Sequence, residues 1–187
     1  MKRLFPTLPE TPDLGDVFRT FPATLAPILE LNDKVLLADS ALSTADRELI
    51  AAYVSGLNAC TYCLGSHTRA AEAFGVDPAL IDALIADPTT APVEDRLKPI
   101  LAYVTCLTQT PAMVTEAMAQ VVFDAGWSEQ ALYDAILVCA MFSFMNRIVE
   151  GTGVTADFTN LPAMTEDEKA ARRTRTYSDW GRSAGLI

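Results

Sequence analysis

The chain has 187 residues, and its 24 acidic against 14 basic side chains give a formal net charge of −10. This length is typical of one domain. A hydrophobic share of 50% is enough for a sizeable core and argues against a disordered chain. The acidic balance argues against a nucleic-acid partner, because binding to a phosphate backbone needs clustered positive charge. We therefore expect a single folded domain over residues 1–187.

Membrane spans and export signals are not expected. The longest uncharged apolar-rich run, Ala135 to Asn146, lies between Asp134 and Arg147 and is too short to cross a bilayer. The N-terminal residues turn to proline and acid before an apolar signal region could develop. We expect a cytoplasmic protein in a reducing compartment, so its four cysteines are not assumed to form a disulfide framework.

The first half of the chain predicts four helices, at about residues 22–40, 44–57, 60–74 and 78–86. Ser43 or Thr44 suits the N-cap of the second helix, since acidic residues follow in its first turns. Gly75 is a good residue to end the third helix. Asp77 and then Pro78 form an N-cap and a first helical residue for the fourth.

The second half predicts helices at about residues 94–108, 114–125 and 128–148, followed by a C-terminal arm. Pro99 is expected to disturb the first of these helices locally. Gly151 and Gly153 are expected to end the long apolar helix that Ser128 caps. Because no segment alternates polar and apolar residues as a strand does, the sequence predicts an all-α fold.

The C-terminal arm, at about residues 160–187, begins with a helix that Thr165 caps and whose charges change from acidic to basic. Its arginines are expected on a solvated face. Tyr177 and Trp180 are hard to bury on a small monomer, so the arm should either pack on a neighbouring subunit or form a loose tail. Together with the apolar helix 128–148, these aromatic residues favour a homo-oligomer.

Residues 60–67 contain the side chains that are best suited to catalysis. Cys60 and Cys63 are three residues apart and His67 follows four residues later, so on a helix all three share one face. Two cysteines at this spacing are close enough to form a disulfide, and the positive end of the helix dipole favours the reactive thiolate. His67 is the only histidine in the chain. An imidazole one turn away can accept the thiol proton.

Glu48 joins this face only if the chain reverses. On one continuous helix, its twelve-residue offset from Cys60 would mean about 18 Å of rise, which is too far for proton exchange. A reversal around Gly56 to Asn58 would bring its carboxylate beside the Cys and His side chains. There it could orient the imidazole of His67, as acids do in nucleophile–His–acid arrangements.

The pattern Glu-x11-Cys-x2-Cys-x3-His, within residues 43–75, resembles the core of the AhpD-like alkylhydroperoxidases, a branch of the carboxymuconolactone decarboxylase superfamily. Asn58 and Tyr62 give it the form of the uncharacterised peroxidase-related members. The resemblance extends through the helical context to Asn146 and Arg147. It implies an AhpD-like helical fold that forms homo-oligomers, and a thiol-dependent reductase of small hydroperoxides.

The resemblance also implies a role for each residue. Cys63 would attack the peroxide, Cys60 would be the proton donor and resolving thiol, and His67 and Glu48 would relay protons. The cycle needs no metal, haem or flavin, and a lipoyl- or thioredoxin-type dithiol would restore the thiols. Well-studied members carry a second histidine directly before the latter cysteine, where this chain has Tyr62. A phenol with a pKa near 10 cannot replace that base.

Other interpretations remain open for these residues. The two cysteines could be an incidental buried pair, or they could bind zinc with His67 and Glu48. His67 could act alone as the acid/base of a carboxymuconolactone decarboxylase-type enzyme, or the cysteine pair could be a non-enzymatic redox sensor. Two further sets lie outside the motif. Cys106 and Cys139 are expected to pack in the core. Asn146 and Arg147 are expected to be either a buried polar pair or polar groups of a pocket.

Overall fold

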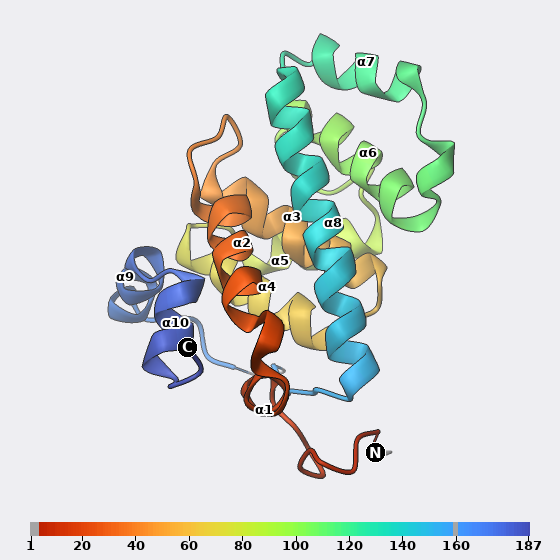
Figure 1. Cartoon of the computed structure of the whole chain (residues 1–187). Helices are drawn as coiled ribbons and strands as arrows, with labels where there is room; N and C mark the ends of the chain where they lie inside the picture. Colours follow the sequence, from red (N-terminus) through yellow and green to blue (C-terminus); the bar gives the residue numbers. More distant parts are fainter. Residues whose placement is uncertain (1–3, 159–160) are drawn as a thin grey trace.

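The computed structural model describes residues 4–158 and 161–187, and in these ranges it contains ten α-helices, three 3-10 turns and no strand (Figure 1). This confirms the all-α fold class. The helices are α1 (Leu14–Thr20), α2 (Leu25–Leu37), α3 (Thr44–Leu57), α4 (Thr61–Ala73), α5 (Pro78–Ala86), α6 (Lys98–Gln109), α7 (Glu116–Asp124), α8 (Glu129–Thr152), α9 (Glu166–Thr174) and α10 (Tyr177–Ser183).

Helix α3 lies at the centre of the fold, in contact with α2, α4, α5, α6 and α8. Its N-terminus has the predicted cap, because Ser43 and Asp46 bond to each other's backbone amides in a capping box. Most of its residues are buried, including the largest fully buried side chain, Tyr53. Helix α8 runs the length of the molecule beside α3 (Figure 1).

Helix α8 is one of the longest and most apolar segments of the chain. Among the described residues it is the single helix long and apolar enough to cross a membrane by length and composition. Half of the relevant stretch is buried inside the fold, where α8 contacts α2, α3, α4, α6 and α7. These contacts make α8 a core helix. It extends to Thr152, one turn beyond the predicted end, and stops at Gly153, whose φ of 76° is left-handed.

The chain reverses between α3 and α4 through a Schellman motif. The amide of Ala59 donates to the carbonyl of Gly56 and that of Cys60 to the carbonyl of Ser55, each at 2.9 Å. Ala59 adopts a φ of 56°, which glycine normally occupies in this motif. The reversal expected at residues 56–58 is therefore present, but the left-handed residue is an alanine one position later.

Two local expectations were wrong, and one helix was not predicted. Pro99 lies in the first turn of α6, where it removes no helical hydrogen bond and causes no irregularity. Helix α1 was not predicted, although Asp13 and Asp16 form a capping box at its start. Cys106 is half-buried at the end of α6 and is not a core residue, whereas Cys139 is buried and contacts the Thr108 hydroxyl at 3.2 Å.

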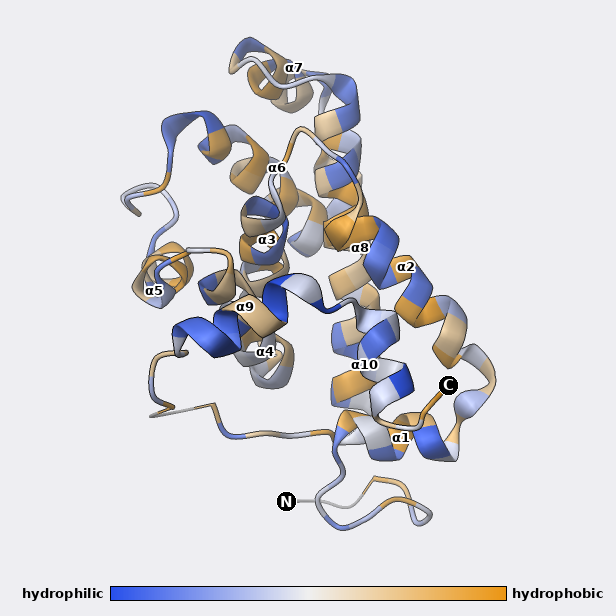
Figure 2. Cartoon of the chain, turned by 90° about the vertical axis from the view of Figure 1, so that its left-hand side faces the viewer, coloured by the Kyte–Doolittle hydropathy of each residue, from blue (hydrophilic) through white to orange (hydrophobic). Residues whose placement is uncertain are grey.

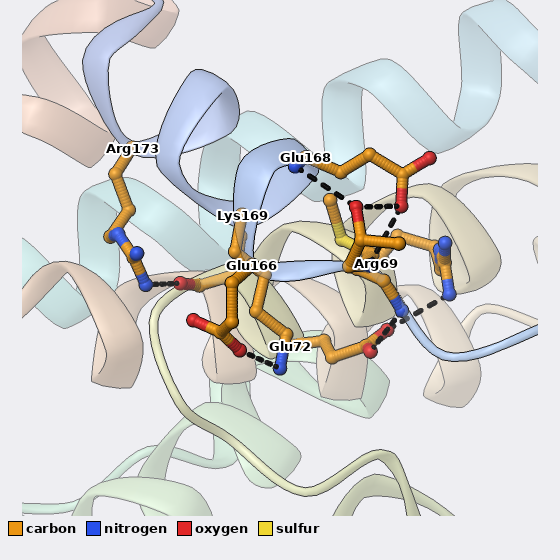
Figure 3. Close-up of polar contacts among 9 residues, drawn as sticks. Arg69, Glu72, Glu166, Glu168, Lys169 and Arg173 are labelled. Atoms are coloured by element: carbon orange, nitrogen blue, oxygen red, sulfur yellow. Dashed lines mark hydrogen bonds and ion pairs between the residues drawn. The ribbon is translucent and has the colours of Figure 1, made fainter.

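The C-terminal arm packs on its own chain, so it is not the loose tail that the sequence allowed. Figure 2 shows α9 and α10 lying over the helical body, and α9 contacts α4 while α10 contacts α2. Figure 3 shows Arg69 and Glu72, the two side chains of α4 that make the first attachment. The buried carboxylate of Glu72 accepts from the amide of Met164 at 2.7 Å, and Arg69 donates to the carbonyl of Pro162 at 2.7 Å. These bonds hold the start of the arm against α4.

Two further attachments place α9 and α10. Arg173 donates to the carbonyl of Ala73 at the C-terminus of α4 at 2.9 Å, so this arginine is not on a purely solvated face (Figure 3). The carboxylate of Asp33 accepts from the amides of Tyr177 and Ser178 at 2.6 and 3.2 Å. At Gly181, a Cβ atom would lie 2.4 Å from the Leu29 side chain, so glycine permits α10 to approach α2 closely.

The strain at Ala59 leads to a stability prediction. Replacing Ala59 by glycine removes the unfavourable left-handed alanine, an effect of roughly 1–2 kcal/mol, and this is partly offset by the greater freedom of glycine in the unfolded chain. We expect Ala59→Gly to be as stable as the wild type or slightly more stable. Ala102→Gly, at an exposed position inside α6, should instead cost about 1 kcal/mol. The urea unfolding midpoint of Ala59→Gly should lie at or above that of the wild type, and the midpoint of Ala102→Gly should lie below it.

Assembly is the second prediction. With the arm packed on its own chain, the apolar side chains left exposed include Tyr133 and Phe144 on α8 and Val121 on α7, which are 54%, 47% and 54% exposed. We propose that this part of α7 and α8 forms the interface of a homo-oligomer. Light scattering should report a particle mass that is a multiple of 20.2 kDa, and Phe144→Glu should lower this mass. A wild-type particle of 20.2 kDa would contradict the proposal.

Candidate functional site

The site is built where α4 begins, against α3 and α8. Cys60 is the N-cap of α4, Cys63 is its third residue and His67 follows one turn later. Because α3 and α4 are antiparallel neighbours, Glu48 returns to the same region and is fully buried. The structure thus brings together all four residues that the sequence singled out.

The two thiols have opposite tendencies to ionise. A hydrogen bond from Cys60, the charge of His67 and a contact with Asn146 lower the pKa of Cys63 to about 7, although burial acts in the other direction. The same bond and the burial of Cys60 raise the pKa of Cys60 well above its ordinary value. Cys63 is therefore the thiol that is partly ionised at neutral pH, and Cys60 is held protonated as its donor.

His67 and Glu48 form a short, buried contact, with 2.6 Å between Nδ1 and Oε2. An ionised carboxylate only accepts, so we assign the proton to Nδ1, which leaves Nε2 free of this bond. Phe142 of α8 packs edge-on against the imidazole at 4.2 Å between ring centroids. The burial of Glu48 acts to raise its pKa, but the interactions with His67, Arg172 and Tyr177 outweigh it and lower the pKa.

Asn146 of α8 belongs to the site, whereas Arg147 does not. The Asn146 side chain is buried and accepts from Asn58 at 2.9 Å and donates to Ser55 at 3.0 Å. These two bonds fix its orientation, and it also stabilises the thiolate of Cys63. Arg147 is exposed and bonds within its own helix. The two residues are therefore not a buried pair, and only the asparagine reaches the site.

A cavity of about 230 Å³ opens onto the reactive face. Its wall includes Cys63 and His67 from α4 and Phe142 and Met145 from α8, while Cys60 is not part of it. A small molecule in this cavity could therefore meet Cys63 but not Cys60. Most of the wall is apolar, which is typical of a small-molecule site with a few convergent polar groups.

The arm completes the wall of this cavity, and this feature was missed in the sequence. Arg172, Tyr177 and Trp180 line the cavity, and the Tyr177 hydroxyl donates to Oε1 of Glu48 at 2.9 Å. The arm is about 130 residues from Glu48 in the chain. No local spacing links the two, so no sequence pattern within the arm could have pointed to this contact.

Tyr62, the departure from the family pattern, contributes its ring. It lines the cavity and packs edge-on against Phe158 at 6.0 Å between ring centroids. Burial, together with the nearby thiols of Cys63 and Cys60 and the carboxylate of Asp13, raises the pKa of Tyr62 to about 12. Its phenol therefore stays protonated near neutral pH and cannot serve as a base.

The four side chains of the site are not arranged as a metal centre. Within residues 4–158 and 161–187, no group of three or more His, Cys, Asp or Glu side chains is arranged to hold a metal ion. In the zinc interpretation, Glu48 and His67 would both face the ion, whereas here they bond to each other. The arrangement instead joins a nucleophilic thiol, a proton acceptor and a buried carboxylate.

Comparisons with solved structures identify similar folds. The chain is similar to an uncharacterized peroxidase-related protein from Silicibacter sp. TM1040, with 26% identity, a TM-score of 0.71 and coverage of 77% of this chain and 75% of that one. It is also similar to an uncharacterized peroxidase-related protein from Ralstonia eutropha JMP134, described as an alkylhydroperoxidase AhpD core, with 20% identity, a TM-score of 0.72 and coverage of 76% and 75%.

A third similar structure is a protein of unknown function from Agrobacterium tumefaciens, with 18% identity, a TM-score of 0.65 and coverage of 76% of this chain and 96% of that one. No curated protein matches the chain in sequence. The sequence model of the Carboxymuconolactone decarboxylase family matches residues 22–105, the part that contains the Glu, Cys, Cys and His of the site. The match over residues 22–105 and the similar structures thus support a place for the chain in the carboxymuconolactone decarboxylase superfamily, with an AhpD-like fold.

Proposed function

We propose that the chain is a thiol-dependent peroxide reductase in which Cys63 is the attacking thiol. The observation that carries the proposal is the contrast between the two cysteines. Cys63 lines the cavity and has a pKa near 7, whereas Cys60 lies behind it with a raised pKa. The superfamily and the peroxidase-related neighbours agree with a peroxidase-related or decarboxylase-type activity. The thiol chemistry rests on the site itself.

In the first step, the thiolate of Cys63 attacks one oxygen of the hydroperoxide O–O bond. A sulfur–oxygen bond forms as the O–O bond breaks, so Cys63 becomes a sulfenic acid and the peroxide is reduced to an alkoxide. Nε2 of His67 holds the proton that the thiol released and gives it to the alkoxide, which leaves as the alcohol. Glu48 keeps the imidazole oriented through Nδ1.

In the second step, Cys60 attacks the sulfur of the Cys63 sulfenic acid. A disulfide forms and water leaves, and the raised pKa of Cys60 means that its proton must go to the departing hydroxide. Two exchanges with an external dithiol, of the lipoyl or thioredoxin type, then return both thiols and oxidise the donor to its disulfide. We place this cycle in a reducing cytoplasm, and it needs no metal or organic cofactor.

The second candidate is a decarboxylase-type reaction with His67 as acid/base, and the family match is the observation that favours it. In that reaction the thiols would be idle. A redox sensor would also use the pair but without turnover. The cysteine variants distinguish the three functions, because each function gives Cys60 and Cys63 a different role.

Removal of the attacking thiol is the central prediction. We expect Cys63→Ser to abolish reduction of cumene hydroperoxide with a supplied dithiol, because serine cannot form a sulfenic acid. Cys60→Ser should allow a single oxidation of Cys63 and then stop. Cys139→Ser, in the core and away from the cavity, is the matched control and should keep turnover. Wild-type turnover in Cys63→Ser would disprove the assignment, and oxidation without turnover in the wild type would favour a sensor.

The pKa of Cys63 leads to a pH prediction. Because the thiolate is the reactive form, alkylation of Cys63 by iodoacetamide should be fastest above pH 7 and fall about tenfold per pH unit well below it. A free cysteine would show this inflection near pH 8.5. In His67→Ala the inflection should move to higher pH, since the thiolate loses a stabilising charge. Mass spectrometry of the labelled Cys63 peptide measures the rate, and an unchanged inflection would remove His67 from the relay.

A further inference from the structure

We propose that Tyr177 of the C-terminal arm is a positioning residue for the peroxide reaction, acting on the Glu48–His67 pair together with Arg172. This inference rests on the proposed function and extends it to a part of the chain that lies outside the family match at residues 22–105. Tyr177 does not touch the reacting sulfur. Its action passes through Glu48.

Tyr177 contacts both members of the pair. Its hydroxyl donates to Oε1 of Glu48 at 2.9 Å, while His67 bonds to the other oxygen, Oε2. Its ring also lies nearly parallel to the imidazole, with centroids 6.3 Å apart and planes 24° apart. Since Phe142 packs on the imidazole as well, the ring of His67 contacts an aromatic residue of the body and one of the arm.

Arg172 contacts both Tyr177 and Glu48. Its Nη2 donates to the Tyr177 hydroxyl oxygen at 2.8 Å and lies 3.5 Å from Oε1 of Glu48. Its guanidinium also lies 4.9 Å from the centre of the Tyr177 ring. The positive charge and the phenol therefore both act on the carboxylate oxygen that His67 does not use.

The position of Tyr177 is set by the body of the protein. Tyr177 is the first residue of α10, and its backbone amide donates to Asp33 of α2. Asp33 also accepts from the amide of Ser178. Upstream, Arg173 is bonded to the end of α4. With anchors on both sides, the Tyr177 hydroxyl has little freedom to leave Glu48.

The chemical effect follows from the donors on Glu48. Donors on Oε1 stabilise the carboxylate of Glu48 and help to lower its pKa. An ionised Glu48 keeps Nδ1–H of His67 directed at Oε2, so that Nε2 is the nitrogen that gives a proton to the alkoxide when the O–O bond breaks. Tyr177 thus holds the pair in the geometry for the step in which His67 acts as an acid, and it also prevents Glu48 from rotating away.

Tyr177→Phe tests this inference, because it keeps the ring and removes only the hydroxyl. We expect kcat for peroxide reduction to fall roughly tenfold or more, as for the loss of one hydrogen bond to a charged group, with little change in KM. Tyr103→Phe makes the same change in α6, at a buried position that does not line the cavity, and should leave turnover unaltered. Turnover in Tyr177→Phe equal to the wild type would overturn the inference.

A spectroscopic readout separates positioning from a purely structural role. His67 is the only histidine, so the ring signals of a ¹⁵N-histidine-labelled sample belong to it alone. In Tyr177→Phe, Glu48 loses one donor and becomes a stronger acceptor for the remaining one. We therefore expect the Nδ1–H proton resonance of His67 to move downfield, and to stay in place in Tyr103→Phe. A fall in activity without this shift would reduce Tyr177 to a structural role and overturn the inference.

Asp33→Ala provides a second variant that leaves the Tyr177 hydroxyl intact but removes its anchor. It should reproduce both the loss of turnover and the change in the His67 signal, while far-ultraviolet circular dichroism reports that the fold remains. An unchanged His67 signal would contradict the anchoring. Failure of the proposed function is recognised separately, because full activity of Cys63→Ser would disprove the thiol mechanism whatever the His67 resonance does.

Discussion

A fully buried carboxylate governs the organisation of this protein. Removing an ionised Glu48 from water would be costly without partners, and its charge persists because donors reach both of its oxygens. His67 serves Oε2, while Tyr177 and Arg172 serve Oε1. These partners come from α4 and from the arm, so the α3–α4 reversal and the return of the C-terminus onto α2 are both needed to stabilise one charge.

The two thiols also differ in their position relative to the cavity. Cys60 and Cys63 are one helical turn apart, yet one faces the cavity and the other does not. A hydrogen bond between them moves their pKa values in opposite directions, and Asn146 adds a further contact to the one that ionises. For the proposed reaction, this geometry favours an order in which the accessible thiol reacts first and the protonated thiol second.

The arm changes how the family match should be interpreted. The matched residues 22–105 contain the motif, but the cavity and the carboxylate are completed by α8 and α10. The family match by itself therefore does not describe what closes the cavity of this chain. Tyr62, inside the matched residues, also lines the cavity, and its phenol stays protonated near neutral pH.

Local chemistry in the sequence was sufficient to predict helices α2 to α9, several of their caps and the shared face of Cys60, Cys63 and His67. Helical spacing and capping depend on neighbours within a few residues, so the pattern is readable along the chain. The return of Glu48 required only a reversal that Gly56 and Asn58 suggested. The left-handed Ala59, by contrast, follows from the geometry of that reversal and has no signature of its own.

Only the tertiary structure determined where the C-terminal arm packs. The sequence suggested that Tyr177 and Trp180 were too apolar for a monomer surface, but it could not show that Asp33, Glu72 and the end of α4 would hold them against the chain's own cavity. Contacts between residues about 100 to 145 positions apart leave no local pattern, because they arise when separately formed helices pack.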